Sequence, residues 1–272
     1  MDHPPGPPEP WTSESSPAGA VPAATLIVLR DAEAGGPPEA LMLQRSSTMA
    51  FAAGATVFPG GRVDDADRLL AARLTHHGAV EDAAARIAAI RETIEEAGLA
   101  VGLSSMPPKA VVAAMRSALH DGAPLGAVLD AHGLSLALDA LEPFARWCPG
   151  RSEIGRITRV FDTRFYLAQA PCDAHLATAD TTENVRLRWV SAAQMIADCD
   201  AGREKAIFPT RRNLERLARG ASHAEIVEQT RAHPLEMVTP WEEVRDGALH
   251  LCIPTHLGYP VTSESVTTAS RT

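Results

Sequence analysis

Short apolar runs alternate with polar turns along this chain and predict a series of strands and helices. Runs rich in β-branched and aromatic residues predict strands at 25–29, 40–44, 56–58, 159–167, 185–190 and 249–253. Apolar residues at helical spacing predict helices at 80–97, 111–119, 125–131, 136–141, 192–199, 209–217 and 224–231. Strands and helices are thus mixed along the chain, which predicts an α/β fold.

The distribution of Pro, Gly and Ser predicts one ordered domain with loose ends. Residues 1–22 are rich in these three types, and we expect them to form a disordered arm. Residues 23–261 form the expected domain, which a helical insertion interrupts over about 107–142 after Pro107-Pro108. The Ser- and Thr-rich residues 262–272 are expected to form a disordered tail.

The net charge of −9 argues against a polyanionic partner. Nucleic-acid polymers and anionic membranes are bound through Lys and Arg, and this chain has 25 of these against 34 Asp and Glu. We therefore expect neither as a partner. A small phosphorylated molecule can still bind where a divalent cation inverts the local charge.

Cysteine usage and the N-terminal residues predict a cytoplasmic protein. The four cysteines form no CxxC pair, which favours free thiols in a reducing compartment over a zinc site or a disulfide framework. The adjacent His76 and His77 have no further ligands at zinc-binding spacing. The N-terminus lacks the pattern of a secretory signal, and no apolar run approaches the ~20 residues that span a bilayer. The oligomeric state stays open, and a homodimer is one of the alternatives.

Three glutamates at 92, 95 and 96 form the most informative motif. On a helix, positions i, i+3 and i+4 are neighbours on one face, so Glu92, Glu95 and Glu96 repel one another. Near the C-terminal end of a helix they also oppose the helix dipole. Mg²⁺ or Mn²⁺ would relieve this conflict, because both prefer hard oxygen ligands.

The alternative interpretation is that these glutamates form a solvated helix face, as charge runs often do. Two neighbouring features favour a site instead. Arg91 can orient a carboxylate through a bidentate contact. The segment 58–61, Phe-Pro-Gly-Gly, follows a predicted strand and leaves bare backbone that a ligand can approach closely.

The string Arg91-Glu92-x-x-Glu95-Glu96-x-Gly98-Leu99, preceded by a Gly-Gly turn, resembles the Nudix box of the Nudix hydrolase family. The second half of the family pattern is present, with Thr93 at a position that is usually apolar. The first half differs, because the loop between the turn and the helix is enlarged. The first glutamate of the family pattern would fall at Asp67, whose role the sequence leaves open.

Further residues resemble the Nudix branch of coenzyme A diphosphatases with an enlarged box. They are Gln44-Arg45-Ser46-Ser47, Phe51, Val57-Phe58-Pro59-Gly60-Gly61, Arg159-Val160-Phe161-Asp162-Thr163, Phe165, Glu183 and Trp189. The resemblance covers about residues 23–217. The arginine that this branch usually carries before Phe-Pro-Gly-Gly is absent, since Ala50 or Phe51 stands there.

This resemblance implies a small mixed β-sheet between helices and a set of site residues. Metal ligands would be Glu92, Glu95, Glu96 and the carbonyl of Gly60, holding Mg²⁺ or Mn²⁺. Catalytic roles would fall to Glu92, Glu96, Arg91 and Glu183, and the general base would be Glu92 or a loop acid such as Glu183. Substrate contacts would come from Arg45, Phe58 and Gly61. Glu183 and Arg45 are equally well read as ordinary surface charges.

The implied reaction is metal-dependent hydrolysis of a diphosphate bond in a nucleoside diphosphate linked to another group. Coenzyme A or acyl-coenzyme A is the first substrate hypothesis, and ADP-ribose or NADH is the alternative. A non-catalytic regulatory module that binds nucleotide is a rival of another class, and a helical scaffold with an incidental glutamate face is a third. Arg211 and Arg212 are predicted to form an exposed helix face, with phosphate binding as the alternative.

Overall fold

The structure is a computed structural model, which describes residues 16–32, 35–49, 52–75, 78–149, 160–180 and 183–269. Residues of the sequence interpretation that lie outside these ranges are Ala50, Phe51, His76, His77 and Arg159. The strands are β1 (Ala20–Arg30), β2 (Glu39–Arg45), β3 (Thr56–Val57), β4 (Gly60–Arg62), β5 (Glu142–Trp147), β6 (Val160–Gln169), β7 (Asn184–Ser191), β8 (Met237–Val238), β9 (Trp241–Arg245), β10 (Ala248–Cys252) and β11 (Ser263–Ser265). The helices are α1 (Asp65–Arg73), α2 (Val80–Ala97), α3 (Lys109–His120), α4 (Leu125–His132), α5 (Ala192–Asp200), α6 (Phe208–Leu217), α7 (His223–Arg231) and α8 (Val266–Ala269), with short 3₁₀ turns η1 (Leu138–Ala140) and η2 (Ala174–Leu176).

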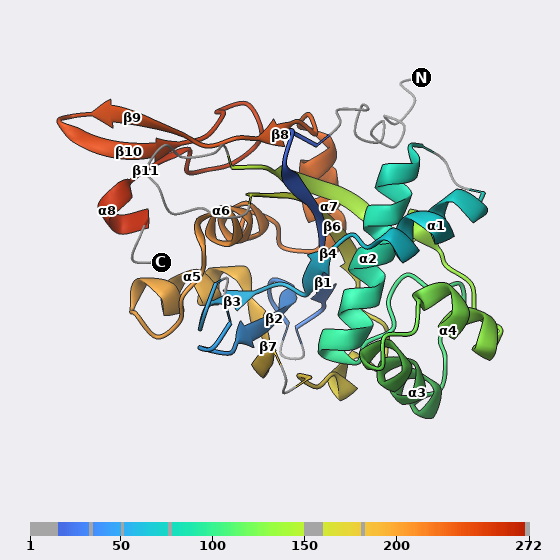
Figure 1. Cartoon of the computed structure of the whole chain (residues 1–272). Helices are drawn as coiled ribbons and strands as arrows, with labels where there is room; N and C mark the ends of the chain where they lie inside the picture. The colour runs from blue at the N-terminus through green and yellow to red at the C-terminus, as the bar shows by residue number, and fades with distance from the viewer. Residues whose placement is uncertain are drawn as a thin grey trace, which may run out of the picture.

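Within the described residues, eight strands form a mixed sheet and three form a smaller one (Figure 1). The main sheet has the order β3-β2-β1-β6-β5-β8, with β4 paired to β1 and β7 paired to β2. β1 runs parallel to β6, and β5 runs parallel to β8, whereas the other pairs are antiparallel. In the smaller sheet β10 lies between β9 and β11, and this sheet projects from the body of the molecule (Figure 1).

Helices cover both faces of the main sheet. On one face α2 packs against β1, with α1, α3 and α4 around it, and this core includes Leu26 and Val28. The opposite face carries a second core, which includes Ile27 and Leu29 and is completed by α5, α6 and α7 (Figure 1). Successive residues of a strand point to opposite faces, so β1 is buried on both sides. The predicted α/β fold, with a sheet between helices, is confirmed.

Helix α2 has the predicted bounds, 80–97, and ends at a glycine. Ala84 and Ala88 are fully buried, and such small side chains let the helix lie close to its neighbours. Gly98 follows in the left-handed conformation with φ of 61°, which glycine adopts without a Cβ penalty. The helix packs against the sheet, α1 and α3, and these contacts fix its direction.

Helix α1 lies in the enlarged loop between the Gly-Gly turn and α2, where the sequence pattern predicted no helix. Asp64 and Asp67 form a reciprocal capping box, in which each side chain accepts from the backbone of the other residue. The pattern Asp-x-x-Asp was therefore a local helix signal, which the acidic composition of the loop obscured. The helix predicted over 136–141 is also wrong, because only the short turn η1 forms there.

Both ends of the ordered domain extend beyond their predicted limits. β1 begins at Ala20, because residues 20–29 pair with β6, so the last residues of the predicted arm 1–22 are part of the sheet. β11 and α8 occupy residues that were predicted to belong to the loose tail 262–272. Pairing with partners distant in sequence orders both segments.

Arg211 and Arg212 do not form the exposed helix face that the sequence predicted. Their side chains are 13% and 2% exposed. Arg212 pairs with Glu215 and Glu264, so it ties α6 to β11. Two adjacent arginines in a helix can therefore be buried when carboxylates, including one from another element, pair with them.

All four cysteines are free, in agreement with their spacing. Ser191 caps α5, since its side chain accepts from the backbone of Gln194. Of the helices in the described ranges, none combines the length and the apolar character that spanning a bilayer requires.

Candidate active site

The C-terminal half of α2 lies against Gly60 and Gly61 at the start of β4, which together form a glycine corner. The backbone nitrogen of Gly60 donates to Glu96 Oε2 at 2.9 Å. A Cβ atom added to Gly61 would collide with the carboxylate of Glu92, so any other residue at this position would displace that side chain. The structure thus brings together the glutamate motif and the Gly-Gly turn, which the sequence separates by about thirty residues.

Glu96 is the most enclosed of the three glutamates, with an exposed fraction of 5%. Besides Gly60, it accepts from Asn184 Nδ2 at 3.1 Å, and Asn184 is itself fully buried at the start of β7. Burial, together with the charge of Glu92, raises the pKa of Glu96 to about 8. A buried carboxylate with so little compensating charge is unfavourable in the absence of a cation.

Glu92 is held mainly by Arg91, which donates to Glu92 Oε1 at 2.8 Å. Burial raises the pKa of Glu92 to about 7, and the charge of Glu95 adds to this increase, whereas Arg91 opposes it. Glu95 also accepts from Arg91, at 3.2 Å. One guanidinium therefore keeps two of the three glutamates close together.

Arg91 is itself fixed by Asp67 of α1. Its Nε and Nη2 donate to the two carboxylate oxygens of Asp67 at 3.2 and 3.0 Å, and Nη2 also donates to the carbonyl of Arg62 at 2.9 Å. Although burial lowers the pKa of Arg91, the hydrogen bond to Asp67 and the nearby carboxylates raise it above its ordinary value. Asp67 is 1% exposed and anchors the arginine, so the enlarged loop supplies a support for Arg91.

The carboxylate oxygens of Glu92, Glu95 and Glu96 are the kind of ligand that a hard divalent cation prefers, although the three side chains do not converge on one point. Within the described ranges, no three His, Cys, Asp or Glu side chains are grouped as ligands around a common centre. Glu92 and Glu95 face Arg91, and Glu96 faces Gly60 and Asn184. Crowded, desolvated carboxylates beside a corner that only glycine can form are suited to Mg²⁺ or Mn²⁺.

Arg45 and Glu183 lie together at the edge of this cluster. Their side chains are 3.6 Å apart at the closest nitrogen and oxygen, and are 13% and 55% exposed. The Nε atom of Arg45 is buried and has no hydrogen-bond partner among the described residues. The positive charge of Arg45 partly opposes the rise in the pKa of Glu96, so the guanidinium lies within electrostatic reach of the motif.

Phe58 lies elsewhere than the sequence interpretation expected. Its side chain is 3% exposed and belongs to the core under α5, α6 and α7, on the face of the sheet opposite α2. Strand alternation explains the difference, because a residue near Gly60 and Gly61 can point to either face. The expected substrate contact from Phe58 is therefore not supported by its position.

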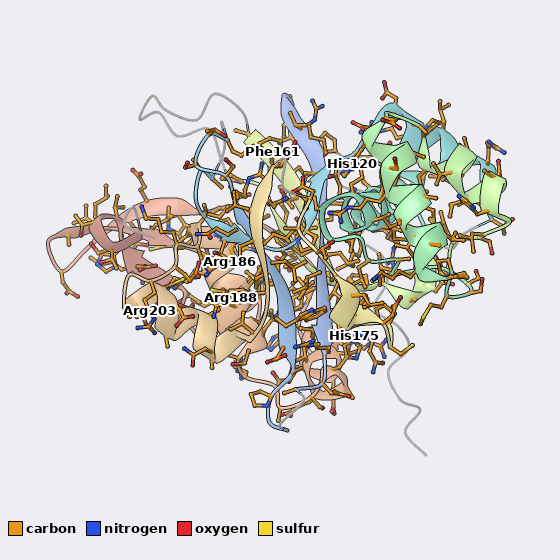
Figure 2. All side chains as sticks on the ribbon, turned by 90° about the horizontal axis from the view of Figure 1, so that it is seen from below. His120, Phe161, His175, Arg186, Arg188 and Arg203 are labelled. Atoms are coloured by element: carbon orange, nitrogen blue, oxygen red, sulfur yellow. The ribbon has the colours of Figure 1, made fainter. Side chains whose placement is uncertain are left out.

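A second charged cluster, on β7 and the segment after α5, is paired internally. Arg186 and Arg188 both contact Glu204, and Arg203 pairs with Asp198 at 2.7 Å. Figure 2 shows the three arginines on the side of the molecule away from the green helices. Each of the three arginines already pairs with Glu204 or Asp198, so this cluster is a poorer candidate for a phosphate site.

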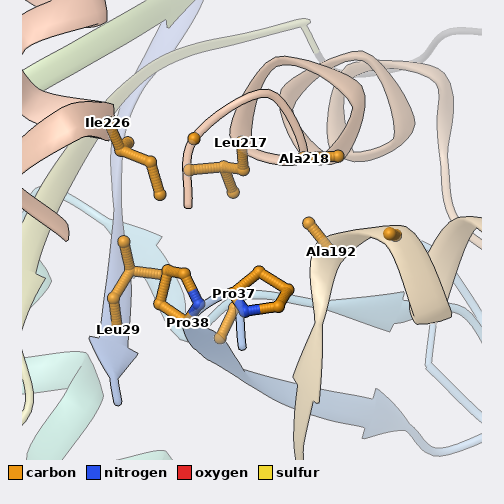
Figure 3. A pocket seen from close by; sticks show the side chains of 10 residues that line it. Leu29, Pro37, Pro38, Ala192, Leu217, Ala218 and Ile226 are labelled. Atoms are coloured by element: carbon orange, nitrogen blue, oxygen red, sulfur yellow. The ribbon is translucent and has the colours of Figure 1, made fainter. Parts of the chain in front are cut away.

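An apolar pocket between the β1–β2 turn and α5, α6 and α7 is also distinct from the glutamate cluster. Its lining residues are Leu29, Pro37, Pro38, Ala40, Ala192, Ala193, Leu217, Ala218, Gly220 and Ile226 (Figure 3). No charged or metal-ligating side chain is among them. The pocket therefore lacks the groups that diphosphate chemistry requires.

Sequence reasoning missed Asn184 and Arg116 and left Asp67 without a role. Asn184 follows Glu183 at the beginning of a strand, where nothing in its local pattern distinguishes it from a turn residue. Arg116 lies on α3 and donates to backbone carbonyls of Glu95 and Glu96. Only Asp67 had a local signal, through its capping box with Asp64.

The sequence matches no protein-family profile. Among solved structures, the chain is similar to a Nudix hydrolase from Alicyclobacillus acidocaldarius, with 28% identity and a TM-score of 0.66 over 77% of this chain and 96% of that one. This likeness and the arrangement of the main sheet and its helices show that the protein has the fold of the Nudix hydrolases, with the glutamate motif lying against Gly60 and Gly61. A weaker likeness joins it to an Ap4A hydrolase from C. elegans, at 17% identity and a TM-score of 0.38 over 72% of this chain and 93% of that one.

Proposed function

We propose that this enzyme hydrolyses the diphosphate bond of a nucleoside diphosphate linked to another group, with Mg²⁺ or Mn²⁺ held by Glu92, Glu95, Glu96 and the carbonyl of Gly60. The observation that supports this most is the placement of the buried Glu96 and the partly buried Glu92 against Gly60 and Gly61. Carboxylates placed in this way are stabilised when a divalent cation joins them. A cation bound there would neutralise the diphosphate and lower the pKa of the attacking water.

The protein groups around this site have separate tasks. Arg91, anchored by Asp67, holds Glu92 and Glu95 in place, and Asn184 and the Gly60 nitrogen hold Glu96. Glu92 or Glu183 takes the proton from water, and the exposed position of Glu183 leaves its carboxylate accessible to substrate. Arg45, whose buried Nε has no hydrogen-bond partner among the described residues, would bind a phosphate oxygen of the substrate.

For the substrate we propose coenzyme A or an acyl-coenzyme A, cleaved to 3′,5′-ADP and a 4′-phosphopantetheine species. The support is the resemblance of 44–47 and 57–61 to the coenzyme A branch, combined with the pairing of Arg45 and Glu183, two residues of that resemblance, at 3.6 Å. ADP-ribose and NADH contain the same diphosphate linkage and are the alternative substrates.

The test is a panel of coenzyme A, acetyl-coenzyme A, ADP-ribose, NADH and diadenosine polyphosphates, with products identified by mass. We expect cleavage of coenzyme A at the diphosphate in Mg²⁺ or Mn²⁺ and none in EDTA. Cleavage of another member of the panel, with coenzyme A left intact, would overturn the substrate assignment, whereas the proposed reaction class would still hold. Nucleotide binding without turnover of any member in either metal would overturn the catalytic proposal.

A further inference from the structure

The last turn of α2 is covered by a side chain from the helical insertion. The backbone carbonyls at the C-terminal end of a helix have no partner within the helix. Arg116 of α3 meets two of them, donating from Nε to the Glu95 oxygen at 2.8 Å and from Nη2 to the Glu96 oxygen at 3.0 Å. A cation at this end also complements the helix dipole.

The same guanidinium holds a second segment, which leads to β7. Arg116 Nη1 donates to Thr178 Oγ1 at 3.0 Å, and Nη2 donates to the Thr178 carbonyl at 2.9 Å. Thr178 in turn donates its backbone nitrogen to the carbonyl of Ala97 at 2.9 Å. Arg116 and Thr178 thus fasten residues near 178 to the end of the glutamate helix.

The segment beyond Thr178 reaches back to Glu96. Asp180 accepts from the backbone nitrogens of Glu183 and Asn184 at 3.1 and 2.9 Å. Asn184 then donates to Glu96 Oε1 at 3.1 Å. Both ends of this segment therefore contact the end of the glutamate helix. Thr178 does so through its backbone and through Arg116, and Asn184 does so through its side chain.

Gly98 and His120 also border the contact between Arg116 and the end of α2. A Cβ atom on Gly98 would lie 2.9 Å from Arg116 Nη1, so the glycine that ends α2 also admits the guanidinium. His120, one turn further along α3, has Nε2 at 3.1 Å from the Glu95 carbonyl. The insertion thus contributes two side chains to one end of α2.

We propose that Arg116 is a positioning residue, which holds the backbone of Glu95 and Glu96 in register with the segment that carries Glu183 and Asn184. This inference rests on the proposed function, because it treats Glu95 and Glu96 as metal ligands. Groups that hold ligands in place contribute strongly to metal sites, and their loss typically costs 10–100-fold in affinity or activity. The helical insertion would then support the chemistry as well as cover the sheet.

The experiment compares Arg116→Ala and Arg116→Lys with the wild-type protein. Three quantities are measured for each protein. Mn²⁺ affinity is measured by calorimetric titration without substrate. The melting temperature is measured in EDTA, and kcat and KM are measured in saturating Mn²⁺. Leu129→Ala is the matched control, since Leu129 is a buried core residue of the same insertion that lies on α4. It should lower the melting temperature and leave Mn²⁺ affinity within about twofold of wild type.

We expect Arg116→Ala to weaken Mn²⁺ binding by about tenfold or more. Arg116→Lys keeps the charge and loses the planar fork, so its affinity should fall between alanine and wild type. This variant also serves if the alanine variant does not fold. Mn²⁺ affinity in the Arg116 variants no weaker than in Leu129→Ala would overturn the inference, and a wild-type protein that binds no Mn²⁺ would overturn the proposed function and the inference together.

Discussion

At the residue scale, each glutamate of the motif depends on neighbours that offset the repulsion between the carboxylates and the cost of burying them. Arg91 compensates Glu92 and Glu95, whereas among the described residues Glu96 has only a backbone nitrogen and an amide as direct hydrogen-bond donors. Burying a carboxylate costs free energy unless an opposite charge is near, so the site is poised to gain from a cation. Glu96 is therefore the residue whose removal should separate function from stability most clearly.

Glu96→Gln should abolish most of the activity without destabilising the fold. The glutamine oxygen can still accept from the Gly60 nitrogen, and its NH₂ group can donate to Asn184 Oδ1 once that amide turns over, whereas the charge that a cation requires is lost. We expect kcat/KM to fall by at least about a hundredfold, since losing a ligand costs no less than losing its support. The melting temperature in EDTA should stay equal or rise, as measured by calorimetry. A fall of several degrees would instead assign Glu96 a structural role.

Gly61→Ala should act through Glu92, because the added Cβ collides with that carboxylate. The φ angle of Gly61 lies outside the left-handed region, so the backbone accepts alanine and the loss should appear in kcat and Mn²⁺ affinity rather than in folding. Gly126→Ala on α4 is the control, where the new methyl group meets only a flexible leucine side chain. Equal kinetics for both variants and wild type would contradict the close approach of Gly61 and Glu92.

At the element scale, buried ion pairs join strands whose pairing the sequence does not reveal. Arg146 of β5 donates to both carboxylate oxygens of Asp162 on β6, at 2.8 and 2.7 Å, and both side chains are nearly inaccessible. Arg146 interrupts the apolar run of β5, and for this reason the sequence did not predict that strand. The pair makes a charged residue compatible with an interior strand.

Asp162 should make stability depend on acid pH. Burial tends to raise its pKa, but the hydrogen bonds and charge of Arg146 lower it below the ordinary value. A lowered pKa in the folded state contributes stability above the unfolded pKa of about 4, and this contribution is lost as pH falls through the folded value. Urea unfolding at pH 7 and pH 3 should show a larger loss for wild type than for Asp162→Asn. Equal losses would exclude Asp162 as a source of this dependence.

At the scale of the whole molecule, the site lies where α2, β4, β7 and the helical insertion meet. The metal ligands, their support on α1 and the cap from α3 come from segments that fold around one another. Binding at such a junction should stabilise the protein as a unit, because a ligand that binds only the native state shifts the folding equilibrium.

Mn²⁺ should therefore raise the melting temperature measured by scanning calorimetry. At 100 times the dissociation constant the stabilisation is about 2.7 kcal/mol, which corresponds to a rise of about 5–10 °C for a domain of this size. Glu95→Gln should reduce the rise and leave the melting temperature in EDTA nearly unchanged. An equal rise in wild type and in Glu95→Gln would remove Glu95 from the ligand set.

Sequence reasoning could recover those features of the fold and site that depend on nearby residues. The bounds of α2, its glycine end and the common face of Glu92, Glu95 and Glu96 all follow from helical periodicity. The α/β class followed from the order of apolar runs. In contrast, α1 and β5 were missed because acidic residues in one and Arg146 in the other masked the expected patterns.

The sequence by itself determined the spacing of the three glutamates, the bare Gly-Gly turn and the mixture of strands and helices, because each is a property of residues close together in the chain. Only the tertiary structure decided that Asp67 anchors Arg91, that Asn184 holds Glu96 and that Arg116 caps the glutamate helix. These contacts join residues about 20 to 90 positions apart. Chain packing selects such pairs, and no local pattern of propensity or polarity encodes them.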